Sequence, residues 1–180
     1  MKLLENFKNS IRNFVIKNQL KSKRNKVEFH NLETAKSIHV FFDARTDEDY
    51  QPVKAFLSEL KEMGKKIKAV GYTENEEQKA KFLFFKEVTF ISSKDTNWFS
   101  KPGKELNKEL EAYPADIFMN FAPEDCFAGR YLSAVSNAKF KVSGIKGDLV
   151  ADFVVETAEN KDTKYLIEQT KHFLNTIKKA

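Results

Sequence analysis

The sequence predicts an α/β fold: a three-layer Rossmann-like sandwich on a mostly parallel sheet of five or six strands. Short apolar runs alternate along the chain with segments whose apolar residues recur at helical spacing. Of the 180 residues, 41% are apolar, whereas Gly and Pro number only 6 and 4. This composition supports a packed core and argues against disorder or a turn-rich all-β fold. Strands that alternate with helices form right-handed βαβ units, which cover a parallel sheet on both faces.

Six short segments are the expected strands. The first is the apolar run from Ile38 to Phe42, which Asp43 ends. The other five lie, in chain order, at 67–72, 88–91, 116–120, 140–142 and 153–155. We expect the first and fourth strands to be adjacent, because the strand order of a Rossmann-like sheet reverses between them.

Helices are expected between these strands. Residues 50–63 form one of them, and Gly64 follows in the position where a left-handed residue ends a helix. The residues expected on its buried face are Val53, Phe56, Leu57, Leu60 and Met63. Further helices are expected near 103–112 and 124–136, while residues 75–85 are ambiguous. Asp162 is expected to cap a last helix, whose core-facing residues are Leu166, Phe173, Leu174 and Ile177.

Residues 1–35 are expected to form a basic N-terminal helical arm, and residues 36–180 a single α/β domain. Of the 31 Lys and Arg and 26 Asp and Glu in the chain, residues 1–26 hold eight bases and one acid, a net charge of +7. The remaining 23 bases and 25 acids give −2. The apolar residues of the arm recur at helical spacing, and they are Leu3, Leu4, Phe7, Ile11, Phe14 and Val15.

Two interpretations of the arm stay open. Either residues 3–16 pack on the body and leave 17–26 in solvent, or the helix binds an anionic membrane surface or a protein partner. The basic residues that such binding would use are Lys8, Arg12, Lys17, Lys21 and Arg24. Nucleic-acid binding is not expected, because the body carries no excess of basic residues. The sequence also leaves open whether the chain forms a homodimer.

The first 20 residues carry charged or amide side chains throughout and lack the continuous apolar region of a signal peptide. No stretch approaches the roughly 20 apolar residues of a membrane span. We therefore expect a cytoplasmic protein, at most peripheral to the inner face of the membrane. The single Cys126 excludes an internal disulfide and a metal site built from cysteines.

Ligands of an open α/β sheet bind beyond the carboxyl ends of the strands, near the point where the strand order reverses. The loops expected there are 43–49 and 120–126. The candidate ligand-binding residues of this cleft are Asp43, Arg45, Asn120, Glu124 and Asp125, together with Trp98. We assign no catalytic residue, no metal ligand and no cofactor.

Loop 43–49 contains no glycine, so it can form neither a dinucleotide fingerprint nor a phosphate-binding P-loop. Both expected helix starts are also acidic, with Asp47, Glu48 and Asp49 on one and Glu124 and Asp125 on the other. Carboxylates there stabilise the helix dipole and repel phosphate, so nucleotide phosphates are not expected to bind in the usual way. The same acids could surround a divalent cation or a cationic ligand, although solvated helix-start acids are the commoner case.

Four residues of these loops each have two interpretations. Arg45 is expected to pair with a neighbouring acid rather than with a substrate. Asn120 either orients a ligand or satisfies loop backbone. Cys126, expected in the first turn of a helix, is interpreted as a packing residue. Trp98 is a stacking platform or lid, or, as we favour, a plug at the edge of the core.

Two family resemblances rest on particular segments. One resemblance is carried by residues 97–102 (Asn-Trp-Phe-Ser-Lys-Pro), by 115–121, and by Glu124-Asp125-Cys126 leading to 139–142. These segments resemble an uncharacterised bacterial family of short α/β proteins. That resemblance implies a fold and no activity. A more distant similarity is carried by residues 38–43, 47–49, 51–57 and 113–142. These segments are similar to the N-terminal Rossmann-like half of the heptosyltransferases. The glycine-and-aspartate signature of that family's first loop is missing here, and its sugar-nucleotide-binding half has no counterpart.

We therefore predict a non-catalytic binding module that acts through its basic arm on a membrane surface or a protein partner. The alternative is a small-ligand-binding protein or glycosyltransferase-like enzyme that uses the cleft at the carboxyl ends of the first and fourth strands.

Overall fold

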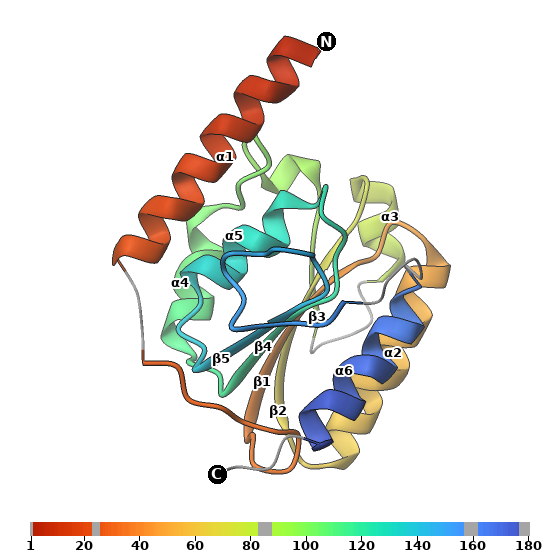
Figure 1. Ribbon diagram of the computed structural model, residues 1–180. Coiled ribbons are helices and arrows are strands. Elements are labelled where there is room, and N and C mark those ends of the chain that lie inside the picture. Colours follow the sequence, from red (N-terminus) through yellow and green to blue (C-terminus); the bar gives the residue numbers. More distant parts are fainter. Residues whose placement is uncertain (1, 23–25, 83–87, 157–161, 177–180) are drawn as a thin grey trace.

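The computed structural model describes residues 2–22, 26–82, 88–156 and 162–176, and it confirms a three-layer α/β fold (Figure 1). A six-stranded sheet lies between two layers of helices. Its strand order is β3-β2-β1-β4-β5-β6, and every pairing between these strands is parallel. The first and fourth strands are therefore neighbours, as the sequence predicts, and the strand order reverses between them.

The strands lie close to their predicted places. Their bounds are Ser37–Asp43 (β1), Lys66–Tyr72 (β2), Val88–Ile91 (β3), Ile117–Asn120 (β4), Phe140–Ser143 (β5) and Phe153–Val154 (β6). The last six residues of β1 are all buried, because a central parallel strand is covered on both faces. Phe41 and Phe42 point to opposite sides, and each enters a separate apolar cluster.

The cluster around Phe42 is covered by α2 (Asp47–Glu62) and α6 (Thr163–Thr176). The N-cap of α2 is Thr46, whose hydroxyl accepts a hydrogen bond from the Asp49 amide at 3.1 Å. Gly64, at φ +72°, follows the helix in the left-handed conformation that its position predicts. The short helix α3 (Glu76–Lys81) occupies part of the ambiguous segment.

The cluster around Phe41 is covered by α4 (Lys104–Ala112) and α5 (Phe127–Val135). All residues of α5 except Arg130 are buried. A short 3₁₀ helix, η1 (Ser93–Asp95), begins the long loop between β3 and α4.

The helix α1 (Lys2–Ser22) lies outside the α5 layer, and its N-terminal half extends beyond the rest of the fold (Figure 1). Ile16 is buried among the side chains of the Phe41 cluster, with Val15 and Leu20 packed against it. The apolar residues nearer its start stay exposed, by 87% at Leu3, 58% at Phe7 and 65% at Phe14. The expectation that residues 3–16 pack on the body is therefore met only at the end of that segment.

Residues 26–36 run along the amino end of the sheet and contribute to its core. Leu32 and Ala35 are buried in the Phe42 cluster. Asp116 fixes this segment, because its carboxylate accepts hydrogen bonds from the Lys36 and Ser37 amides at 2.8 and 3.2 Å. Lys139 lies 2.9 Å from the same carboxylate.

Three sequence predictions need correction. The helix α5 begins at Phe127, so residues 124 and 125 precede it in a turn, where the Cys126 amide donates to the Pro123 carbonyl at 3.0 Å. Met63 is the C-cap residue of α2 and is 42% exposed, so it does not share the buried face of Val53, Phe56 and Leu60. Phe173 is 37% exposed at the edge of the sheet, where its ring contacts that of Phe153. Ile177 lies outside the described residues.

Candidate functional site

A hollow of about 500 Å³ opens at the carboxyl ends of β1, β4 and β5, and we call it the switch-point cleft. Its walls come from the loops after these strands and from the start of α6. The polar side chains that line it are those of Asp43, Arg45, Asp49, Glu124, Lys146, Glu156 and Thr163. This position, next to the reversal of strand order, is the usual ligand site of an open α/β sheet.

Asp43, the last residue of β1, is 6% exposed and is held by Arg45. The Arg45 side chain donates to both of its carboxylate oxygens, at distances down to 2.7 Å, and the Arg45 amide donates at 3.0 Å. These hydrogen bonds raise the pKa of Arg45 above its ordinary value. The guanidinium also reaches Asp125 at 3.4 Å. The prediction that Arg45 pairs with a neighbouring acid is confirmed.

Asn120, the last residue of β4, is fully buried and pairs in register with Phe41. Its side-chain carbonyl accepts a hydrogen bond from the Ala122 amide at 3.2 Å, so it satisfies loop backbone. Its amide nitrogen has no hydrogen-bond partner among the described residues. A Cβ on Gly129 would lie 2.7 Å from the Asn120 side-chain oxygen and 2.6 Å from the Phe41 ring. Only glycine therefore lets α5 pack so closely on these two strands.

The acidic residues near the cleft differ in their surroundings. Asp49, in the first turn of α2, accepts hydrogen bonds from the hydroxyls of Thr46 at 2.6 Å and Thr163 at 3.0 Å. Glu124 and Asp125 are exposed in the turn before α5, and this corrects the expectation that they begin that helix. Within the described residues, no three His, Cys, Asp or Glu side chains are placed to hold a metal ion.

Cys126 and Trp98 lie in contrasting environments. Cys126 is 6% exposed and precedes α5, and burial raises the pKa of its thiol to about 12. The thiol is therefore protonated at neutral pH, and the packing interpretation of Cys126 agrees with its burial. Trp98 is 56% exposed, so it does not plug the core. Its ring stacks on that of Phe7 in α1, with centroids 6.3 Å apart, and it does not line the switch-point cleft.

The basic residues of the arm are also unequal. Lys17 and Lys21 are exposed, and Lys8 is half-buried. Arg12 faces the body, where its side chain donates to the Phe99 carbonyl at 3.0 Å and the Ser100 hydroxyl at 3.2 Å. Arg12 thereby holds α1 against the loop that carries Trp98. Arg24 lies outside the described residues.

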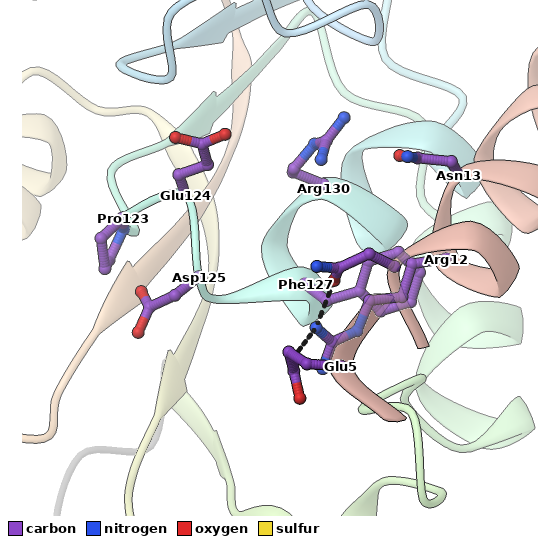
Figure 2. Close-up of a pocket in the computed structure, with 9 residues that line it drawn as sticks. Glu5, Arg12, Asn13, Pro123, Glu124, Asp125, Phe127 and Arg130 are labelled. Carbon is purple, nitrogen blue, oxygen red and sulfur yellow. Dashed lines mark hydrogen bonds and ion pairs between the residues drawn. The ribbon is translucent and has the colours of Figure 1, made fainter. Parts of the chain in front are cut away.

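A second hollow, of about 880 Å³, lies between α1 and the start of α5, and we call it the arm groove (Figure 2). One wall is formed by the side chains of Glu5, Asn9, Arg12 and Asn13, and the other by Pro123 to Asp125, Phe127 and Arg130. Pro123 and Glu124 line both hollows. The turn that contains them is therefore a thin partition between the two.

Sequence reasoning missed Arg130 and its partner Asp148. Arg130 Nε lies 3.5 Å from the Asp148 carboxylate, whose side chain is only 1% exposed. One signal was available, because Arg130 is the single charged residue in the apolar segment from Phe127 to Val135. A cation in a buried helix normally has a carboxylate partner.

Polar side chains line the hollows on both sides of the turn. Comparison with known proteins gives a family and no activity. The family model described as a family of unknown function (DUF6913) matches residues 8–177. No curated protein matches the chain. The resemblance to an uncharacterised family is thus confirmed over most of the sequence.

Proposed function

The chain belongs to the DUF6913 family, whose function is unknown, and from that premise we propose that it is a binding module that attaches to an anionic membrane surface through α1. The observation that carries this proposal is a group of exposed apolar side chains. We call them the apolar face of α1, and they are Leu3, Leu4, Phe7 and Phe14, with Trp98 beside them.

Exposure of this face is physically unusual. Its members are between 56% and 87% exposed, although apolar faces of helices normally pack against a core. Large contiguous apolar patches on soluble proteins mark interaction sites. No helix within the described ranges is long and apolar enough to cross a membrane, so the face would lie along a bilayer surface.

The charges around the face favour lipid over protein. By helical periodicity, Lys17 and Lys21 lie along one margin of the apolar face and Lys8 along the other. Interfacial helices combine an apolar face with flanking Lys and Arg that attract anionic lipid headgroups. Trp98 suits the same boundary, since its ring is apolar and its N–H is polar. Arg12 ties α1 to the body, so the face is presented by a fixed helix.

Co-sedimentation of the full chain with vesicles tests this proposal. We expect pelleting with vesicles of phosphatidylcholine and phosphatidylglycerol, and much less with phosphatidylcholine alone. The triple variant Leu3→Ser/Phe7→Ser/Phe14→Ser should stay in the supernatant. Leu149→Ser is the matched control, because Leu149 is 68% exposed on another part of the surface. Equal pelleting of the triple variant and the control, or no pelleting of the unmodified chain, would overturn the proposal.

A charge variant separates electrostatic attraction from apolar insertion. At about 1 kcal/mol for each basic residue near an anionic surface, Lys17→Gln/Lys21→Gln should weaken vesicle partitioning roughly thirtyfold. Salt should weaken binding of the unmodified chain in the same direction. A protein partner on this face would show the opposite result, namely partner binding in the absence of vesicle binding.

A second candidate function is small-ligand binding in the switch-point cleft, including glycosyltransferase-like activity. It is supported by the coincidence of a hollow of about 500 Å³ with the reversal of strand order. A thermal-shift screen with sugar nucleotides, nucleotides, divalent cations and polyamines tests it. A stabilising ligand should lose its effect in Glu156→Gln or Lys146→Gln, which alter exposed cleft residues. A blank screen would remove this candidate.

A further inference from the structure

The arm groove is lined by one cation, Arg130, that makes an ion pair but no hydrogen bond within the described residues. Arg130 is 19% exposed, and its Nε faces the Asp148 carboxylate at 3.5 Å. Asp148 in turn accepts a hydrogen bond from the Val150 amide at 3.2 Å, which fixes the carboxylate. Within the described residues, the two terminal nitrogens of Arg130 donate no hydrogen bond. The ion pair with Asp148 thus fixes the Nε side of the guanidinium. Its two terminal nitrogens remain available to a ligand in the groove.

The other cation that lines the groove, Arg12, is already paired. Arg12 donates to Glu5 at 3.3 Å and to Asn9 at 3.0 Å, in addition to the loop behind it. Arg45 holds Asp125 at 3.4 Å from the other side of the turn. Because Arg12, Glu5 and Asp125 are already in ion pairs, we do not assign them to a charged ligand.

One carboxylate on the groove wall remains without a partner. Glu124 is exposed, and no hydrogen bond or ion pair joins it to another described residue. Figure 2 shows the Arg130 guanidinium between Glu124 on one side and Asn13 on the other. The groove therefore offers one free guanidinium end and one free carboxylate, and the Phe127 ring lines the same wall.

We propose that the arm groove binds a small zwitterion of the amino-acid or short-peptide class, with the ligand carboxylate on Arg130 and the ligand ammonium on Glu124. A guanidinium end matches a carboxylate in two parallel hydrogen bonds. Asn13 supplies a further polar group beside the carboxylate position. A ligand with phosphate charge alone would face Glu124 without compensation. The volume of about 880 Å³ accepts a ligand larger than a single amino acid.

This proposal is independent of membrane attachment, and it is tested on the full chain in solution. Ligand-observed NMR with free amino acids and dipeptides identifies binders. For each binder, the N-acetyl and carboxamide analogues remove one charge at a time. We expect each analogue to bind at least tenfold more weakly, since a charge-assisted hydrogen bond contributes about 1.5–3 kcal/mol.

Two variants assign the contacts. In Glu124→Gln, affinity for the zwitterion should fall about tenfold. N-acetylation of the ligand should then lower its affinity for this variant only slightly further, because the carboxylate partner of the ammonium is already gone. In Arg130→Lys, the preference for the acid over the carboxamide should shrink, because lysine lacks the planar end. Glu62→Gln is the control, because Glu62 is exposed and lines neither hollow, and it should bind normally.

The test remains decisive even if Arg130→Lys does not fold. Since Arg130 contacts a buried carboxylate, its variant needs a melting curve beside the binding data. Glu124 is exposed and unpaired, so Glu124→Gln should fold normally and carries the test by itself. Absence of any zwitterion binding, equal affinity for the N-acetyl analogue, or unchanged binding by Glu124→Gln would each overturn the proposal.

Discussion

His39 should make the stability of the fold depend on pH between about 4 and 6.5. This residue lies in the middle of β1 and is 4% exposed. Burial, with a further contribution from nearby Lys68, lowers its pKa from 6.5 to about 4, while Glu109 acts in the opposite direction. Lys68 and Glu109 themselves form an ion pair, and the Phe118 ring packs edge-on against the imidazole.

The magnitude follows from the two pKa values. The unfolded chain takes up a proton near pH 6.5, whereas the folded chain resists protonation until about pH 4. The difference, at roughly 1.4 kcal/mol for each tenfold change in proton affinity, corresponds to about 3 kcal/mol. Because the unfolded state binds more protons in this range, stability is fully present above pH 6.5 and is lost as the pH falls toward 4.

The measurement is urea unfolding, followed by far-ultraviolet circular dichroism, at several values of pH from 4 to 7.5. Unmodified protein should lose about 3 kcal/mol of unfolding free energy across this range beyond the loss shown by His39→Gln. The Gln side chain is of similar length and does not titrate, so its curve reports all other groups. Identical pH dependence of the two proteins would refute the assignment to His39.

Three further predictions concern buried positions. Gly129→Ala should destabilise the fold by about 1–3 kcal/mol through overpacking against Phe41, seen as a lower melting temperature. Gly103→Ala, whose added Cβ would lie 3.8 Å from its nearest neighbour, is the matched control, and equal shifts would contradict the close-packing argument. Burial opposes ionisation of Asp116, but hydrogen bonds led by that from Lys139 prevail and lower its pKa to about 2. Asp116→Asn should therefore be less stable than the unmodified protein at pH 7, by about 1–3 kcal/mol. This difference in unfolding free energy should narrow as the pH falls from 3.8 through 2, because the Asp116 carboxylate then becomes protonated. A difference that stays constant with pH would argue against the lowered pKa. Cys126 should resist alkylation in the native protein at pH 8 and react once urea unfolds it, and equal rates would disprove its burial.

The sheet could be predicted because its signals are local. The run from Ile38 to Phe42 is continuously apolar, as a strand buried on both faces must be, and Gly64 stands where α2 ends. The adjacency of β1 and β4 followed from the topology common to such folds. The pairing of Asp43 with Arg45 was also within reach, because the two residues are separated by a single position.

The remaining features depend on contacts that no local pattern encodes. Glu124 and Asp125 have the composition of a first helical turn, but the helix starts after them. The spacing of Phe7 and Phe14 predicts an apolar face without saying whether the body covers it. Arg130 and Asp148 are brought together only by the packing of α5 against the loop after β5.

The partition between the two hollows has a thermodynamic consequence. A single short turn, from Pro123 to Asp125, borders both, and the 3.4 Å contact between Arg45 and Asp125 fastens it to β1. If occupancy of one hollow displaces this turn, linkage requires that occupancy of the other shift the same equilibrium, by an equal factor in each direction. The protein would then report the presence of one ligand as a change in its affinity for another, without any movement of the sheet.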